Sequence, residues 1–271
     1  MIVRTDHCRP SFQPPRAFTL LELLTVITIM GIIAALSVPT LRALKPNAKV
    51  AATRQLLDAV GRARQLAISQ RTTVYMVFLS TNFWSDSAAA TWSTDDKKAV
   101  TNLCDKQLTG YAYVALRSIG DQPGVYNPTY LSSWRTLPQG AYIPPGKFGL
   151  PALKIVLTNT ALGGLMIPPF SVTNTIPFPS ETNRPPPYVR LSYIAFNGMG
   201  QLVSGVPGQP ELIPVSEGIV SYARDPITKV ALPGQPPTVM ELPPRNTLEN
   251  YSLVYIDRLT GRAHVERRKV Q

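Results

Sequence analysis

The chain has 271 residues, of which 44% are hydrophobic, and its formal net charge is +11 at pH 7. This apolar content excludes an intrinsically disordered protein and is enough for a packed core. Two cysteines and two histidines are too few for a disulfide-rich fold, and their spacing excludes a Cys/His zinc site. The composition therefore predicts a globular part that apolar burial holds together.

An apolar run of 21 residues, FTLLELLTVITIMGIIAALSV, occupies positions 18–38. As an α-helix it would be roughly 31 Å long, close to the hydrocarbon thickness of a bilayer. A cleaved secretory signal has a shorter apolar part and ends in a small-x-small site, which this run lacks. We therefore predict a membrane anchor, with the part after residue 40 outside the cytoplasm, because long segments translocate largely regardless of their charge.

Glu22 is the one charged side chain within this apolar run. An unpaired carboxylate in hydrocarbon costs on the order of 3 kcal/mol, so it persists where a partner or a function holds it. One interpretation is a carboxylate at a helix start, near the headgroups and favoured by the helix dipole. The other is a carboxylate that a second molecule neutralises.

The stretch RAFTLLE at positions 16–22, followed by the apolar run, resembles the class III signal of type IV prepilins and type II secretion pseudopilins. The resemblance implies that a prepilin peptidase cuts between Ala17 and Phe18 and that Phe18 is N-methylated. It also implies that Glu22 pairs with the amino terminus of an adjacent subunit when the helices bundle into a filament. The family normally carries Gly before the cut, where this chain has Ala17. Pro39 falls where family members commonly carry proline, and a helix kink is expected there.

Residues 40–71 continue with helical spacing but become amphipathic. Pro46 removes a backbone donor and clashes with the preceding turn, so we expect a second kink there. The face predicted to be buried comprises Thr53, Leu56, Leu57, Val60, Ala63 and Ala67, and the face predicted to be exposed comprises Arg54, Asp58, Arg62 and Gln65. A helix of this kind needs a sheet to lie on.

The run TTVYMVFL at positions 72–79 is rich in branched and aromatic residues and predicts the first strand. The junction before it resembles the GspH/FimT-like branch of minor pseudopilins and minor pilins. That branch has an Ala-Arg pair, matched by Ala63 and Arg64, then another Ala, matched by Ala67, and a Val-led strand, matched by Val74. The resemblance implies an antiparallel sheet packed on the helix.

Strands are predicted again at 188–196 and 201–203, around a turn at 197–198, and at 251–257 and 263–267, around a turn at 258–261. These hairpins resemble the closing strands of the same branch, in which an apolar-Phe-x-x-x-Gly pattern is matched here by Ile194, Phe196 and Gly200.

Between the first predicted strand and these hairpins, residues 120–187 hold 13 of the 27 prolines. Missing backbone donors at this density predict loops inserted in the head, with short strands around 111–116 and 154–157.

Residue types that carry catalysis are sparse. His264 is the one histidine after the leader, and a surface role is the simpler interpretation of its place in the last hairpin. Asp95, Asp96, Lys97 and Lys98 are interpreted as a solvated turn, with a weak cation site as the alternative. Cys104 is expected to be a small buried hydrophobe. We therefore predict a protein that is not an enzyme and has no cofactor.

The predicted fold class is α+β: a long N-terminal helix, its first half transmembrane, packed on an antiparallel head with proline-rich loops. We expect a cytoplasmic leader over 1–17 that is removed, a transmembrane and filament-core helix over 18–39, an amphipathic helix over 40–71, and a β-rich periplasmic head over 72–271.

The predicted function is that of a minor pilin-like structural subunit of a type II secretion pseudopilus or a type IV pilus, held in the bacterial inner membrane until assembly. Its partners would be other pilin-like subunits through the N-terminal helix, the prepilin peptidase and methyltransferase, and the inner-membrane assembly platform.

Removal of the leader's three Arg and one Asp leaves a net charge of +9, which favours anionic partners. A DNA- or surface-binding minor pilin is therefore the first alternative, although the charges are scattered. A plain signal-anchored envelope protein is the second.

Overall fold

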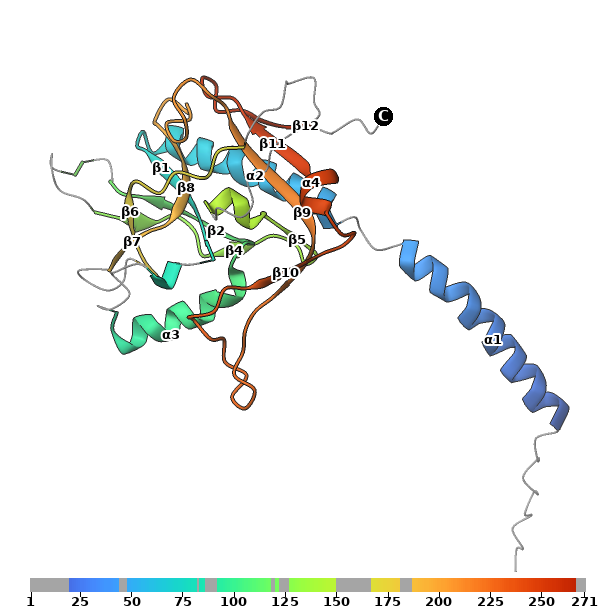
Figure 1. Ribbon diagram of the computed structural model, residues 1–271. Helices are drawn as coiled ribbons and strands as arrows, with labels where there is room; N and C mark the ends of the chain where they lie inside the picture. Colours follow the sequence, from blue (N-terminus) through green and yellow to red (C-terminus); the bar gives the residue numbers. More distant parts are fainter. Residues whose placement is uncertain are drawn as a thin grey trace, which may run out of the picture. The chain divides into compact units, whose positions relative to one another are not determined.

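The computed structural model describes residues 20–31, 48–81, 83–85, 92–117, 120–121, 127–149, 167–180 and 187–266, and the backbone of residues 32–43. The chain divides into two compact units, residues 1–46 and residues 47–271. The first unit contains helix α1 (Leu20–Ala43), and the second contains all other described elements (Figure 1). The predicted combination of helices with antiparallel β-sheets, an α+β fold, is confirmed.

Helix α1 includes Pro39 in its backbone and ends at Ala43. Within the described part of the chain, no helix is at once long enough and apolar enough to cross a membrane. The transmembrane assignment of residues 18–39 therefore stays a prediction from the sequence.

Helix α2 (Ala48–Ser69) is amphipathic as predicted. Its buried side chains include Thr53, Leu56, Val60, Ala63 and Ala67, whereas Leu57 is half-buried against the same core. Arg54, Asp58, Arg62 and Gln65 are exposed. The helix contacts strands of both large sheets, so its apolar face closes one core between them.

The first large sheet has the strand order β3-β2-β1-β8, and β4 also pairs with β2. Its strands are β1 (Val74–Phe78), β2 (Gly110–Ala115), β3 (Thr129–Tyr130), β4 (Arg135–Thr136) and β8 (Ser192–Phe196). Pairing is antiparallel throughout. The strands predicted at 72–79, 111–116 and 188–196 are therefore confirmed, the last of them divided between β8 and the preceding β7 (Tyr188–Arg190).

The second large sheet has the order β10-β9-β11-β12, with β5 also paired to β9. Its strands are β5 (Ala141–Tyr142), β9 (Glu211–Ser221), β10 (Thr238–Glu241), β11 (Ser252–Ile256) and β12 (Ala263–Glu266). The hairpin of β11 and β12 was predicted, whereas β9 was not. Pro214 obscures β9 in the sequence, because proline rarely occurs inside a central strand. Pro214 stands opposite Leu253 of β11, and the β5 ladder does not reach it, because that ladder ends at Ser216.

The proline-rich region is partly described. Its described parts contribute β3, β4, β5 and the strand β6 (Thr175–Pro177), which pairs with β7. Residues 167–180 also bring Ile176 and Phe178 to a second core on the face of the first sheet that α2 does not cover. These parts are therefore integral to the head and not loops inserted in it, while the strand predicted at 154–157 lies outside the described residues.

The tetrad Asp95 to Lys98 is not a solvated turn. It lies in the first turns of helix α3 (Thr94–Leu103), where Ser93 and Asp96 form a capping box: the Asp96 backbone N–H donates to Ser93 Oγ at 3.1 Å, and the Ser93 N–H donates to Asp96 Oδ2 at 3.1 Å. The bonds satisfy two donors that a helix start would leave free. No group of three His, Cys, Asp or Glu side chains placed to hold a metal occurs among the described residues.

The remaining helical elements are short. They are η1 (Phe83–Ser85), η3 (Cys104–Lys106), η4 (Pro145–Phe148) and α4 (Asn246–Glu249).

Cys104 is buried as predicted, and burial raises the pKa of its thiol to about 11. The thiol is therefore protonated and shielded at neutral pH.

Candidate functional site

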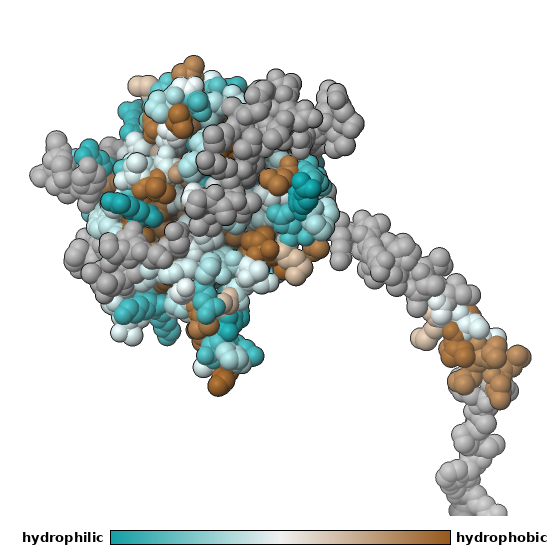
Figure 2. Space-filling view, in the orientation of Figure 1, coloured by the Kyte–Doolittle hydropathy of each residue, from teal (hydrophilic) through white to brown (hydrophobic). Residues whose placement is uncertain are grey.

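Helix α1 exposes a continuous apolar surface at its N-terminal half (Figure 2). The exposed side chains are Leu20, Leu21, Leu23, Leu24, Val26, Ile27, Ile29 and Met30. The hydroxyls between them are satisfied within the helix: Thr25 Oγ1 donates to the Glu22 carbonyl at 2.9 Å and Thr28 Oγ1 donates to the Leu24 carbonyl at 2.9 Å. A surface of this kind needs lipid or other helices to cover it.

Glu22 lies in the first turn of α1, and its side chain is exposed. A carboxylate at this end of a helix is favoured by the helix dipole. The same position leaves it accessible to a cation on another molecule. The geometry is thus compatible with both interpretations of Glu22, and its role in subunit assembly stays a prediction.

Of the other predicted site residues, Pro39 lies within α1, and its role as a helix kink stays a prediction. Ala17 and Phe18, at the predicted cleavage and methylation site, lie outside the described residues, and so does Pro46.

In the head, Arg64 and Gly200, two of the residues that carry the resemblance to the GspH/FimT-like branch, meet at the C-terminal end of α2. Arg64 Nε donates to the Gly200 carbonyl at 3.2 Å and to the Thr260 carbonyl at 2.8 Å. Gly200 and Gly261 have φ values of +78° and +63°, which favour glycine. The arginine therefore ties two turns of the head, one from each large sheet, to the helix that covers both.

We expect two glycines of similar backbone conformation, Gly208 and Gly261, to differ in how much stability is lost when each is replaced by alanine. A Cβ at Gly261 would overlap the Gly200 carbonyl oxygen, whereas a Cβ at Gly208 (φ +79°) would meet nothing within 4 Å. We expect Gly208→Ala to lower the free energy of unfolding by about 1 kcal/mol, the cost of the left-handed backbone. Gly261→Ala should lower it by roughly 2–3 kcal/mol, because overpacking adds to that cost. Urea unfolding of the two variants measures the difference, and equal losses would contradict the close packing of the turns.

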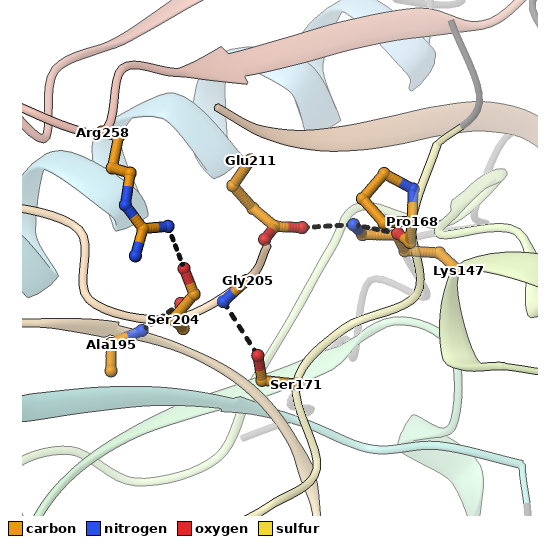
Figure 3. A network of polar contacts seen from close by, with 8 residues as sticks. All are labelled: Lys147, Pro168, Ser171, Ala195, Ser204, Gly205, Glu211 and Arg258. Carbon is orange, nitrogen blue, oxygen red and sulfur yellow. Dashed lines mark hydrogen bonds and ion pairs between the residues drawn. The ribbon is translucent and has the colours of Figure 1, made fainter. Parts of the chain in front are cut away.

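A buried ion pair lies deeper in the head (Figure 3). Lys147, in η4, pairs with Glu211, at the start of β9, and their side chains are 0% and 2% exposed. Lys147 Nζ also donates to the Pro168 carbonyl at 2.7 Å and lies 4.6 Å from the centre of the Phe170 ring. Burial lowers the pKa of Lys147, and the charge of Glu211 opposes that shift. The pair joins η4 to the second sheet, and Lys147 also binds the segment that contains Pro168.

The loop before β9 is held beside this pair (Figure 3). Ser171 Oγ accepts from the Gly205 N–H at 2.9 Å, and Ser204 Oγ accepts from the Ala195 N–H at 2.9 Å. Arg258 Nη1 donates to the Ser204 carbonyl at 3.0 Å. These hydrogen bonds hold the loop before β9 against β8, the segment 167–180 and the turn after β11, so the network stabilises the fold.

His264 lies on β12 and is exposed, with its ring centroid 4.7 Å from that of Tyr255. Its predicted surface position is confirmed. The polar residues that sequence reasoning missed are Lys147 and Glu211, because 64 positions separate them and neither belongs to a motif.

Residues 15–38 match the family model described as the prokaryotic N-terminal methylation motif. The match spans Ala17, Phe18 and Glu22, so the prepilin-type motif predicted from the sequence is confirmed. No curated protein and no solved structure matches the chain. The motif supports a protein of the type IV pilin-like and pseudopilin class. The narrower GspH/FimT-like assignment stays a prediction.

Proposed function

We propose that the chain is a minor pilin-like subunit of a type II secretion pseudopilus or a type IV pilus. The observation that carries the proposal is the methylation motif at residues 15–38, which includes the exposed apolar surface of α1. A head with its own core follows in a separate compact unit. This division suits a subunit whose helix changes surroundings while its head stays folded.

In this proposal the leader is removed on the cytoplasmic side of the inner membrane and the head folds in the periplasm. The apolar side chains of α1 are first covered by lipid and later by the helices of neighbouring subunits. Glu22 then faces the methylated amino terminus at Phe18 of the next subunit. Each of these charges would be costly to bury without the other, so their pairing selects one register between subunits.

Processing at the N-terminus is the first expected result. Mass spectrometry of the protein purified from membranes should find an N-methylated peptide that begins at Phe18. The control is the variant Phe18→Asp, which removes the apolar residue that follows the cut. It is purified from the same membrane fraction. A wild-type chain with an intact Met1 terminus would instead indicate a plain signal-anchored envelope protein, and the proposal would fail.

A further inference from the structure

Two rigid turns form the end of the head at which α2 terminates, opposite the end where the chain enters α2. In the first turn, Asn197 Oδ1 accepts from the Met199 and Gln201 N–H groups at 3.0 and 2.9 Å. In the second, Asp257 Oδ1 accepts from the N–H and the hydroxyl of Thr260, both at 2.7 Å. Because Arg64 binds a carbonyl of each turn, the two turns are fixed relative to one another and to α2.

Apolar side chains are exposed on these turns, on the last turn of α2 and on the loop that follows the first turn. The turn patch comprises Ile68, Met199, Val203, Val206 and Leu259. Met199 and Leu259 are 80% and 75% exposed, far more than a residue placed for packing within the head. Ile68 and Met199 also line a shallow hollow with Arg71, Asn197 and Gly198. Figure 2 shows apolar side chains set among hydrophilic ones at this end of the head, where Figure 1 shows the turns above β8.

Cationic residues accompany the turn patch. Arg71 and Arg262 are exposed, the first beside the hollow and the second at the end of the second turn. Asp257 is the acidic residue of these turns, and the hydrogen bonds of its own turn lower its pKa, so it is ionised at neutral pH. The two exposed arginines outnumber this one carboxylate, so the patch is apolar at its tips and carries a net positive charge at its rim.

We propose that the turn patch docks on the surface of an anionic lipid bilayer. Apolar side chains on rigid turns enter the boundary between headgroups and acyl chains, and flanking arginines bind the phosphates there. A nucleic acid would use the arginines but gain little from the apolar side chains of Met199 and Leu259. Lipid binding by the head goes beyond the proposed function, since a filament subunit does not require it.

The test uses the full chain with Cys8→Ser and a bimane fluorophore on Leu259→Cys. Cys104 does not compete for the label, because it is 3% exposed and burial raises its pKa to about 11. Vesicles of phosphatidylcholine are compared with vesicles that also contain phosphatidylglycerol. Binding through the N-terminal part is common to every labelled variant, so a difference between labels at two places on the head reports on the head. The matched control is Ile227→Cys, an equally apolar tip that is 88% exposed in the loop between β9 and β10.

We expect the label at Leu259→Cys to shift to the blue with anionic vesicles and to stay unchanged with neutral ones, while the label at Ile227→Cys responds to neither. Arg71→Glu should raise the half-maximal lipid concentration about tenfold, and Arg245→Glu, an exposed arginine on another element, should not. Equal shifts at both labels, or none, would overturn the proposal. Binding of duplex DNA that Arg71→Glu abolishes, without a lipid response, would overturn it in favour of a nucleic-acid surface. Failed processing at Phe18 would leave this result unaffected.

Discussion

Glu22→Leu is expected to leave membrane insertion intact and to abolish incorporation into filaments. Leucine lengthens the apolar surface of α1, which includes Leu21 and Leu23 on either side, so insertion has no reason to weaken. In the assembled bundle, however, the amino terminus of the adjacent subunit would be buried without its carboxylate. An uncompensated buried charge costs several kcal/mol, enough to shift an assembly equilibrium by several hundredfold or more.

The measurement compares the amount of each variant in sheared filaments with the amount that stays in the membrane fraction. Glu22→Gln keeps the length of the side chain and removes its charge, so it should fail as Glu22→Leu does, whereas Glu22→Asp should retain partial incorporation. Glu249→Gln is the matched control, because it removes an exposed acidic residue of a helix in the head, one that pairs with Arg245 at 3.1 Å. Normal incorporation of Glu22→Gln would contradict the pairing of charges and leave the helix-dipole interpretation.

The sequence predicts those parts of the fold whose pattern is local. The stripe from Thr53 to Ala67 repeats at helical spacing, and β1, β8 and the hairpin of β11 and β12 combine branched residues with turn signals. Strand β9 escapes this reasoning, because Pro214 and Gly218 interrupt its pattern and both faces of its first half are buried. Helix α3 was missed although the Ser93-x-x-Asp96 spacing of a capping box is visible in the sequence. The run of charged residues after Ser93 was interpreted as a turn because such runs are usually solvated.

In the candidate site, too, the contiguous motif could be predicted from the sequence, whereas contacts between distant residues could not. The methylation motif is a contiguous signal, so residues 15–38 could be identified from the sequence alone. The junction of Arg64 with the two turns joins positions that are 136 and 196 residues apart. The sequence singled out Arg64 and Gly200, but their contact depends on how both sheets pack on α2. Exposure of Met199 and Leu259 likewise follows from turn geometry and not from their residue type.

Removing one partner of the buried ion pair is expected to destabilise the head strongly. Lys147→Met leaves the Glu211 carboxylate buried without a cation, and Glu211→Leu leaves the Lys147 ammonium with the Pro168 carbonyl alone among its hydrogen-bond acceptors. Loss of one member of such a pair costs roughly 3–5 kcal/mol. The comparison pair is Arg224 with Asp105, whose side chains are 47% and 41% exposed, and Arg224→Met should cost at most about 1 kcal/mol.

The double variant Lys147→Met with Glu211→Leu decides why the single variants lose stability. If the loss comes from a desolvated charge left alone, apolar side chains of similar size at both positions should recover most of it, because neither charge then needs a partner. If it comes from the bond between η4 and the Pro168 segment, the double variant should be as unstable as Lys147→Met. Urea unfolding of the purified full chain gives the four free energies of the cycle, and the coupling between the two positions separates the two causes. A coupling near zero would mean that the pair is not what holds these segments together.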